Sequence, residues 1–398
     1  MEHIKRKKHI RRGEKECVEH NGALFLGQKV KFIEGGATMK VKSKQIVLAA
    51  LLVFVLVFFF SVDFASAQKT IKLKYAITHG SPGLNPMADQ SVIWQEEVTR
   101  RSNGAITFEN YWAGALGAPA EHIELLKNGV IDAGIIFGWY TPTKLPFSNF
   151  EYVFPFHPVS YEIVVKAKKQ IRAEIPEFNK EFAQQNAMVL ADLPQTTYTF
   201  ISKEPLRTLD DFKGKKVGLI GRYFGRWLPP GATAVVRPGH DRYDMLKTGV
   251  TTIDFNPLEN MYLFKLNEVT SYCMTGVELI TLANTPICMN IDSFKKLSPE
   301  HQKIVLEAGR YSEERAWKDV LPNWEKKILG EFKAKGMKFV EFPKSEVQKW
   351  AASLEDIPTE WAAEMESKGL PGFQTVKRWQ EITSEMGFKW PRQWGVKR

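Results

Sequence analysis

D-D-F-K-G-K-K-V-G at Asp210–Gly218, Y-D-M-L-K-T-G-V-T-T-I-D-F-N-P at Tyr243–Pro257 and Y-L-F-K-L-N-E-V at Tyr262–Val269 form the most informative stretch of the chain. In the second segment a helix end is followed by Gly249 as a helix stop and by Val250 as the start of a strand. The similar E-L-L-K-N-G-V occurs at residues 124–130. Two lobes of similar topology would explain this echo, although helix–glycine–strand junctions also recur in α/β proteins generally.

The N-terminal region has the pattern of an export signal. Met39 opens a second plausible start, and three lysines, an apolar run at Ile46–Phe60 and A-S-A at Ala65–Ala67 follow it. This succession predicts a signal peptide over residues 39–67, cleaved after Ala67. The apolar run is short for a membrane-spanning helix, which needs about 20 residues, so an uncleaved anchor is the alternative. Residues 1–38 are expected to be a mis-assigned start or a disordered leader.

Charge and cysteine content change once this leader is set aside. The whole chain carries a formal charge of +10, but residues 1–67 hold 12 Lys/Arg and only 6 Asp/Glu, so the mature part carries +4. The remaining charges alternate along what read as solvated helix faces, and no nucleic-acid partner is expected. Cys273 and Cys288 lie in apolar stretches, which favours two buried free thiols over a disulfide.

Strands and helices alternate along the mature chain. A strand is expected at Ile71–Ile77, a helix capped by Asn85 and ended by Asn103-Gly104, and a strand at Ala105–Glu109. A second helix then leads from Pro119 into the strand V-I-D-A-G-I-I, and a long helix begins at Ser298-Pro299, with Pro322 expected to kink or break it. The predicted domains are lobe one at 70–195, completed by part of 283–330, and lobe two at 196–282, completed by part of 325–398.

The order of these segments, from about Ile71 to Thr383, resembles that of TRAP-transporter solute-binding proteins of the DctP type. The match is densest at Asp211–Val269 and extends to Asn103-Gly104, Leu116-Gly117, Leu126–Asp132 and Phe150–Phe156. The resemblance implies an α/β fold of two lobes, similar to periplasmic binding proteins, in which each lobe is a mixed sheet flanked by helices and a long helix spans both. It also implies a periplasmic protein that traps a small organic solute for the small and large subunits of a TRAP permease.

The chain departs from the family at the residue that usually binds the ligand. In the family an arginine follows the K-G-x-K-V element, and its planar fork matches a carboxylate in two hydrogen bonds. Here Lys213–Val217 keeps the element, but Gly218 follows it. A second arginine, present in some acid-binding members, falls at Tyr198. A carboxylate ligand therefore cannot be assumed from the resemblance alone.

Three explanations for the missing arginine stay open. In the first, Arg222, four residues on, reaches the same space and the ligand is an anion. In the second, the ligand is less charged or bulkier and is held by aromatic rings. In the third, the lobe has lost transport binding. The aromatic candidates are Phe137, Trp139, Tyr140, Tyr198, Tyr223 and Phe224. Gly138–Pro142 leaves a strand for a loop, where α/β folds place ligands. Alternatively, these rings belong to the core.

Four further residues are candidates for the same cleft. Asn256 matches the family's asparagine after the K-T-G-V strand, and its amide both donates and accepts hydrogen bonds. Thr78 and His79 end the first strand, and Glu121 starts a helix near the expected ligand. The alternatives are a surface loop for His79 and compensation of a helix N-terminus for Glu121.

Signals for catalysis are weak. H-E-x-x-H, C-x-x-C, the phosphate-binding G-x-x-x-x-G-K-[ST] and G-x-S-x-G do not occur, and the histidines of the mature chain are scattered. We therefore expect no enzymatic activity, no cofactor, no catalytic residues and no metal site. The alternatives to a TRAP subunit are a binding protein of an ATP-driven importer or a sensor, and an exported hydrolase.

Overall fold

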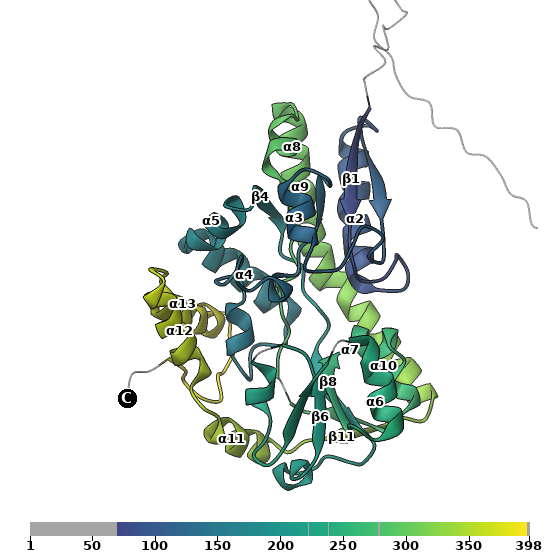
Figure 1. The fold of residues 1–398 in the computed structure, drawn as a ribbon, viewed down its shortest axis with the longest axis vertical. Helices are drawn as coiled ribbons and strands as arrows, with labels where there is room; N and C mark the ends of the chain where they lie inside the picture. The colour runs from purple at the N-terminus through teal and green to yellow at the C-terminus, as the bar shows by residue number, and fades with distance from the viewer. Residues whose placement is uncertain (1–69, 222, 238, 278, 396–398) are drawn as a thin grey trace, which may run out of the picture. The chain divides into compact units, whose positions relative to one another are not determined.

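The computed structural model describes residues 70–395, apart from residues 222, 238 and 278. The predicted leader at 1–38, the signal peptide at 39–67 and Arg222 lie outside these residues. The described part contains two β-sheets with helices around them (Figure 1). None of its helices combines the length and the apolar character needed to cross a membrane.

The first sheet has five strands in the order β2-β1-β3-β10-β4. Its strands are β1 (Ile71–Ala76), β2 (Ile106–Tyr111), β3 (Ala133–Ile135), β4 (Ala187–Ala191) and β10 (Ile287–Asn290). β1 pairs in parallel with β2 and β3, whereas β10 is antiparallel to β3 and β4. The sheet is therefore mixed, because β10 returns to it from far along the chain.

The second sheet has six strands in the order β11-β9-β5-β8-β6-β7. Its strands are β5 (Tyr198–Ser202), β6 (Lys216–Leu219), β7 (Thr233–Val236), β8 (Ile253–Pro257), β9 (Tyr272–Thr275) and β11 (Lys338–Glu341). β6 lies parallel to β7 and β8, and β5 is antiparallel to β8 and β9. Two mixed sheets flanked by helices are the predicted architecture. The sheets follow the two predicted lobes, and the exact lobe boundaries stay a prediction.

Local sequence signals explain the first lobe's leading helix. α2 (Pro86–Arg101) starts where predicted, since the side chain of Asn85 accepts a hydrogen bond from the backbone N–H of Met87. Trp94 and Val98 lie on one face and are fully buried. The helix thus places its apolar face on the sheet of lobe one, as its periodicity predicts.

The long helix spans both lobes and is not broken at Pro322. α9 (Pro299–Arg315) continues through a π-helical turn (Ala316–Val320) into α10 (Leu321–Ala334). The break expected at Pro322 is therefore wrong: the wider turn just before the proline accommodates a ring that would clash in a regular helix. α9 packs against α2 and β4, and α10 packs against α7 (Leu258–Leu263).

The remaining helices complete the two lobes. They are α3 (His122–Lys127), α4 (Tyr161–Glu174), α5 (Glu177–Ala183), α6 (Arg242–Thr248), α8 (Ile291–Lys295), α11 (Lys344–Ser353), α12 (Ile357–Ser367) and α13 (Gly372–Glu385). In Figure 1 α12 and α13 lie beside α4, and an ion pair of 2.6 Å joins Arg378 on α13 to Glu174 on α4. The last helices thus reach lobe one, whereas β11 belongs to lobe two.

The two similar sequence segments, at residues 124–130 and 244–250, both contain a helix end followed by a glycine and a strand. Gly129 after α3 and Gly249 after α6 have φ of 68° and 80°, the left-handed conformation that ends a helix at low cost for glycine. Each is followed by a strand, β3 or β8, that pairs in parallel with a neighbour.

The two cysteines of the described residues, Cys273 and Cys288, are buried and free, and they lie in different sheets.

Candidate ligand-binding cleft

A pocket of about 140 Å³ lies where a turn of lobe one, a loop of lobe two and α12 meet. Its lining residues are Trp139, Pro142, Pro146, Asn149, Tyr152, Ile220, Gly221, Tyr223, Trp361, Glu364, Met365 and Lys368. Most of these side chains are apolar or aromatic, with a few polar groups among them. This is the usual composition of a site for a small organic molecule.

The lobe-one wall of this region is an aromatic cluster at the end of β3. Phe137 precedes a tight 3₁₀ turn, η1 (Gly138–Tyr140), and its ring centroid lies 4.9 Å from Trp139 and 4.4 Å from His79. Trp139 and Tyr140 are 5.6 Å apart. Four of the predicted residues are thus brought together: Phe137, Trp139 and Tyr140 follow β3, and His79 follows β1.

Asn149 holds this turn in place. Its Nδ2 donates to the backbone oxygens of Gly138 at 3.1 Å and Leu145 at 2.9 Å. A β-carbon on Gly138 would lie 3.3 Å from the Asn149 Oδ1, so the approach leaves little room for a side chain. The turn that presents Trp139 is therefore set by a buried amide from a neighbouring loop.

Tyr152 joins the aromatic groups of the two lobes. It lies on η2 (Phe150–Val153), and its ring centroid is 5.8 Å from Trp139 and 5.2 Å from Phe224 of lobe two. Phe224 in turn lies 5.4 Å from Tyr198. Tyr198 is almost fully buried in the core, and its hydroxyl donates to Gln195 Oε1 at 3.0 Å; it does not line the pocket, and its ligand contact stays a prediction.

A buried ion pair lies beside Gly218, where the family arginine is missing. Gly218 on β6 is in register with Asp254 on β8, and Asp254 pairs with the guanidinium Nη1 of Arg242, the first residue of α6. Both side chains are fully buried. The Nε of Arg242 donates to the backbone oxygen of Arg237 at 3.2 Å.

The other oxygen of Asp254 is occupied by the predicted site residue Asn256. The Nδ2 of Asn256 donates to Asp254 Oδ1 at 2.5 Å, and Asn256 is nearly fully buried. Burial raises the pKa of Asp254, and the adjacent Arg242 opposes that shift. Arg242 Nη2, by contrast, has no hydrogen-bond partner in the described part of the chain.

Thr78, His79 and Glu121 are not among the residues that line the pocket. The Thr78 hydroxyl and His79 Nδ1 form a hydrogen bond of 2.9 Å, and burial together with nearby His122 lowers the pKa of His79 to about 4. Glu121 is exposed, and its Oε2 accepts from the backbone N–H of Ala118 at 2.7 Å. Glu121 does not line the pocket, and its ligand contact stays a prediction.

Two chain segments connect the sheets beside this cleft and bind each other. One leads from β4 to β5 and the other from β9 to β10. Their contacts are Gln195 N–H to Leu282 O at 2.9 Å, Tyr198 N–H to Ile280 O at 3.0 Å and Thr285 Oγ1 to Leu193 O at 2.7 Å. The two crossing segments are therefore joined to each other by hydrogen bonds where they pass between the lobes.

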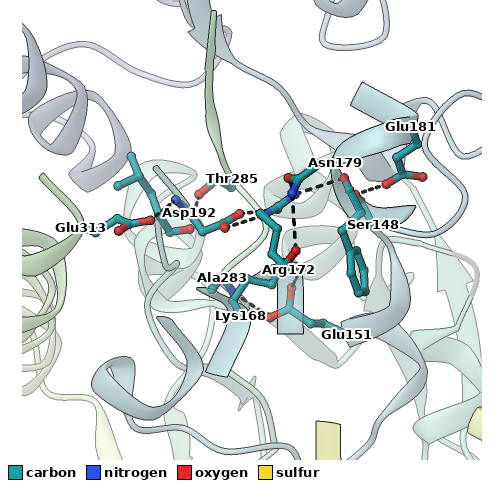
Figure 2. Close-up of polar contacts among 12 residues, drawn as sticks. Ser148, Glu151, Lys168, Arg172, Asn179, Glu181, Asp192, Ala283, Thr285 and Glu313 are labelled. Carbon is teal, nitrogen blue, oxygen red and sulfur yellow. Dashed lines mark hydrogen bonds and ion pairs between the residues drawn. The ribbon is translucent and has the colours of Figure 1, made fainter. Parts of the chain in front are cut away.

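A buried polar network that starts from α4 binds both crossing segments (Figure 2). Arg172 binds both oxygens of Asp192, with Nε at 2.9 Å and Nη2 at 2.7 Å. The backbone N–H of Asp192 donates to Glu313 Oε1 of α9 at 2.9 Å. Arg172 and Asp192 thus connect α4, the first crossing segment and the long helix.

Lys168, one turn earlier on α4, secures the second crossing segment. Its ammonium pairs with Glu151 at 2.6 Å, and both side chains are buried. The other oxygen of Glu151 accepts from the backbone N–H of Ala283 at 3.0 Å. Both crossing segments are therefore held by charged side chains of α4, Asp192 directly by Arg172 and Ala283 through the Glu151 that pairs with Lys168 (Figure 2).

Sequence reasoning missed Arg242, Asp254, Tyr152 and Trp361. One signal was present: Arg242 begins a helix, where a positive charge opposes the helix dipole and so needs another partner. Trp361 comes from α12, far along the chain, and no local pattern marks it. Within residues 70–395, with their three gaps, no group of three or more His, Cys, Asp or Glu side chains is placed to hold a metal ion.

Comparison with known proteins gives one family. A model described as DctP, bacterial extracellular solute-binding protein, family 7, matches residues 77–364. Among relatives, the ectoine/5-hydroxyectoine-binding periplasmic protein UehA of Ruegeria pomeroyi is 25% identical over 219 residues, which are 54% of this chain and 63% of that protein. The match thus spans a little less than two thirds of that relative.

Solved structures share the fold. A TRAP solute-binding protein from Rhodoferax ferrireducens, in complex with copurified benzoate, has a TM-score of 0.70 at 23% identity; the match covers 79% of this chain and 98% of that one. A marine metagenome TRAP solute-binding protein specific for aromatic acid ligands, in complex with metahydroxyphenylacetate, has a TM-score of 0.68 at 25% identity, with 80% and 100% covered.

Proposed function

The chain belongs to the bacterial extracellular solute-binding proteins of family 7, the DctP proteins of TRAP transporters, and on that premise we propose that it captures a small aromatic carboxylate. A protein of this family binds a solute in the periplasm and carries out no chemistry on it. The resemblance read from the sequence and the α/β fold of two mixed sheets agree with this family. The ligand, the membrane partner and the export signal are the finer parts of the proposal.

The observation that carries the ligand proposal is the pocket between Trp139, Tyr152, Tyr223 and Trp361. Four aromatic side chains around one space suit a flat ring, because offset and edge-to-face contacts add to the burial of apolar surface. Enclosing about 120 Å² of a benzene ring contributes about 3 kcal/mol. A relative of the same fold is specific for aromatic acids, which supports extending that class to this chain.

A second candidate is a zwitterionic solute. The unpaired Nη2 of Arg242 would suit the carboxylate of such a solute, whereas both oxygens of Asp254 are already engaged. The ectoine-binding relative makes this class relevant here. The aromatic groups would then contact the cationic part of the solute.

Partners and export follow from the family. The loaded protein would deliver its solute to the small and large membrane subunits of a TRAP permease. The signal peptide at residues 39–67 would be removed after Ala67, which leaves a mature chain that starts just before β1. The predicted contacts of Thr78, His79, Glu121, Tyr198, Gly218 and Arg222 with the ligand belong to the same proposal.

Ligand binding can be tested even while the solute is unidentified. Native mass spectrometry of the purified protein, before and after mild unfolding, identifies any copurified small molecule. A thermal-shift panel of benzoate, 3-hydroxybenzoate, ectoine and galacturonate then ranks the classes, because ligand at 100 times its dissociation constant adds about 2.7 kcal/mol. Aromatic acids are expected to give the largest shift. A shift from galacturonate with none from aromatic acids would contradict the proposal.

A further inference from the structure

We infer that Arg242 is the residue that binds the carboxylate of the solute, with Asp254 as the group that positions it. The inference rests on the proposed function, because it needs a solute with a carboxylate. It adds a residue that neither the sequence motifs nor the pocket lining identified. Three observations support it: the burial of Arg242, its unpaired Nη2 and the lack of an equally buried cation among the described residues that line the pocket.

Arg242 has unused hydrogen-bonding capacity. It is fully buried, and its described contacts use Nε and Nη1, on Arg237 O and Asp254. Nη2 has no partner among the residues that the structure describes. Leaving charged N–H groups buried and unpaired is costly, so this side of the guanidinium calls for an acceptor.

The guanidinium lies beside β6, with Nη1 3.0 Å from the position of a β-carbon on Gly218. Gly218 contributes no side chain there, and the pocket-lining residues Ile220 and Gly221 follow it by two and three positions. In lobe one, burial raises the pKa of Tyr140, and a hydrogen bond with Trp139 and the charge of Arg242 oppose that rise. Tyr140 shares one turn with Trp139, which lines the pocket, and on this basis we place the unpaired Nη2 of Arg242 on the pocket side of the guanidinium.

The fixed orientation of the guanidinium decides the kind of acceptor. Asp254 engages Nη1 and is itself held by Asn256, so the planar guanidinium is fixed and keeps one edge for a further ligand. A carboxylate can bind such a guanidinium with charge-assisted hydrogen bonds, whereas an amide offers one neutral oxygen and must leave its NH₂ group unpaired. The geometry therefore selects an acid over its amide.

Another basic group at the pocket, Lys368, is already paired in an exposed position. It forms an ion pair of 2.8 Å with Glu364, and both side chains are at least one third exposed. Water screens such a pair, and its contribution to ligand selectivity is small. A buried guanidinium with a free edge discriminates more strongly, because a wrong ligand leaves it unsatisfied.

The test compares benzoate with benzamide by isothermal titration calorimetry. Wild-type protein should bind benzoate about 100-fold more tightly than benzamide, and Arg242→Gln should weaken benzoate by about 100-fold while benzamide changes little. Lys247→Gln is the matched control, since it removes a charge from the exposed face of the same helix. It should leave both affinities unchanged.

Arg242→Gln leaves Asp254 buried and unpaired, so the single variant is at risk of unfolding. The double variant Arg242→Gln/Asp254→Asn removes both charges and should fold, as circular dichroism would report, yet bind benzoate no better than benzamide. A double variant that still prefers benzoate would overturn the role of Arg242 and leave the proposed function intact. Wild-type protein that binds neither probe would overturn the proposed aromatic acid itself, and the inference with it.

Discussion

The guanidinium Nη1 of Arg242 lies 3.0 Å from the point where a β-carbon on Gly218 would be, and Asp254 Oδ2 lies 2.5 Å from the same point. Gly218 therefore makes room for the buried ion pair. Its backbone conformation does not require glycine, because its φ is not in the left-handed region. A larger residue at position 218, such as the family arginine, would occupy the space that Arg242 and Asp254 fill in this protein.

Gly218→Ala should destabilise the protein by about 1 to 3 kcal/mol, since the new methyl group displaces Asp254 or Arg242 from a closely packed position. Urea denaturation followed by circular dichroism measures the change. Gly330→Ala is the control, because a β-carbon there meets nothing within 4 Å and alanine favours the surrounding helix. Equal stability of Gly218→Ala and wild type would show that the ion pair has room to move.

The aromatic pocket gives a second prediction. Trp139→Ala should weaken binding of an aromatic acid by about 10- to 100-fold, because it removes a ring in contact with both Phe137 and Tyr152. Trp317→Ala truncates a tryptophan that is not among the pocket-lining residues and should leave affinity unchanged. Fluorescence or calorimetric titration with 3-hydroxybenzoate distinguishes the two. A Trp139→Ala protein of full affinity would move the ligand away from this pocket.

Much of the fold followed from local signals, whereas the site did not. Asn85 caps α2 and Gly249 ends α6, and each acts through neighbours a few residues away. Tyr152 and Trp361 meet at the pocket from distant parts of the chain, and Arg242 reaches Asp254 and Gly218 through tertiary contacts, which no short pattern encodes. The densest family match contains both Asp254 and Arg242, yet the sequence distinguishes Arg242 only as a cation at the N-terminus of a helix, where the dipole disfavours it.

Of the kink or break predicted at Pro322, the break is wrong for a related reason. A proline inside a helical pattern normally predicts a break, but here a π-helical turn accommodates the proline ring, and tertiary contacts of α9 and α10 favour one continuous helix.

The anchor role suggested for Arg222 stays a prediction. Arg222→Ala should leave benzoate affinity close to that of wild type if Arg242 is the anchor, and calorimetry beside Arg242→Gln would separate the two arginines.

The buried pair of Lys168 and Glu151 should be important for stability. Lys168→Met leaves Glu151 charged and buried and should cost about 3 to 5 kcal/mol, whereas adding Glu151→Gln should recover part of that loss. Lys166→Met, two residues away, removes a lysine whose pair with Glu162 is about half exposed, and it should cost less than about 1 kcal/mol. A double-mutant cycle in guanidinium chloride without coupling would contradict this account.

The carboxyl group of Glu313 should make stability depend on pH. Burial, and next the neighbouring Asp192, raise its pKa to about 7, above its ordinary value of 4.5. The folded state therefore holds this proton more tightly than the unfolded state. The resulting stabilisation is fully present below about pH 4.5 and is lost as the pH rises through about 7.

Glu313→Gln removes this titration and keeps an oxygen for the backbone N–H of Asp192. The variant should match the wild type near pH 5 and exceed it by about 1 to 3 kcal/mol at pH 8, where the wild type must bury a charge. Denaturation at several pH values measures the difference between the two proteins, so that buried histidines common to both cancel. Glu314→Gln, at the next, exposed position, should follow the wild-type profile. A variant less stable than wild type at pH 8 would mean that the charge of Glu313 stabilises the junction of α9 with the crossing segment, because Lys169 and Arg172 would then outweigh its burial.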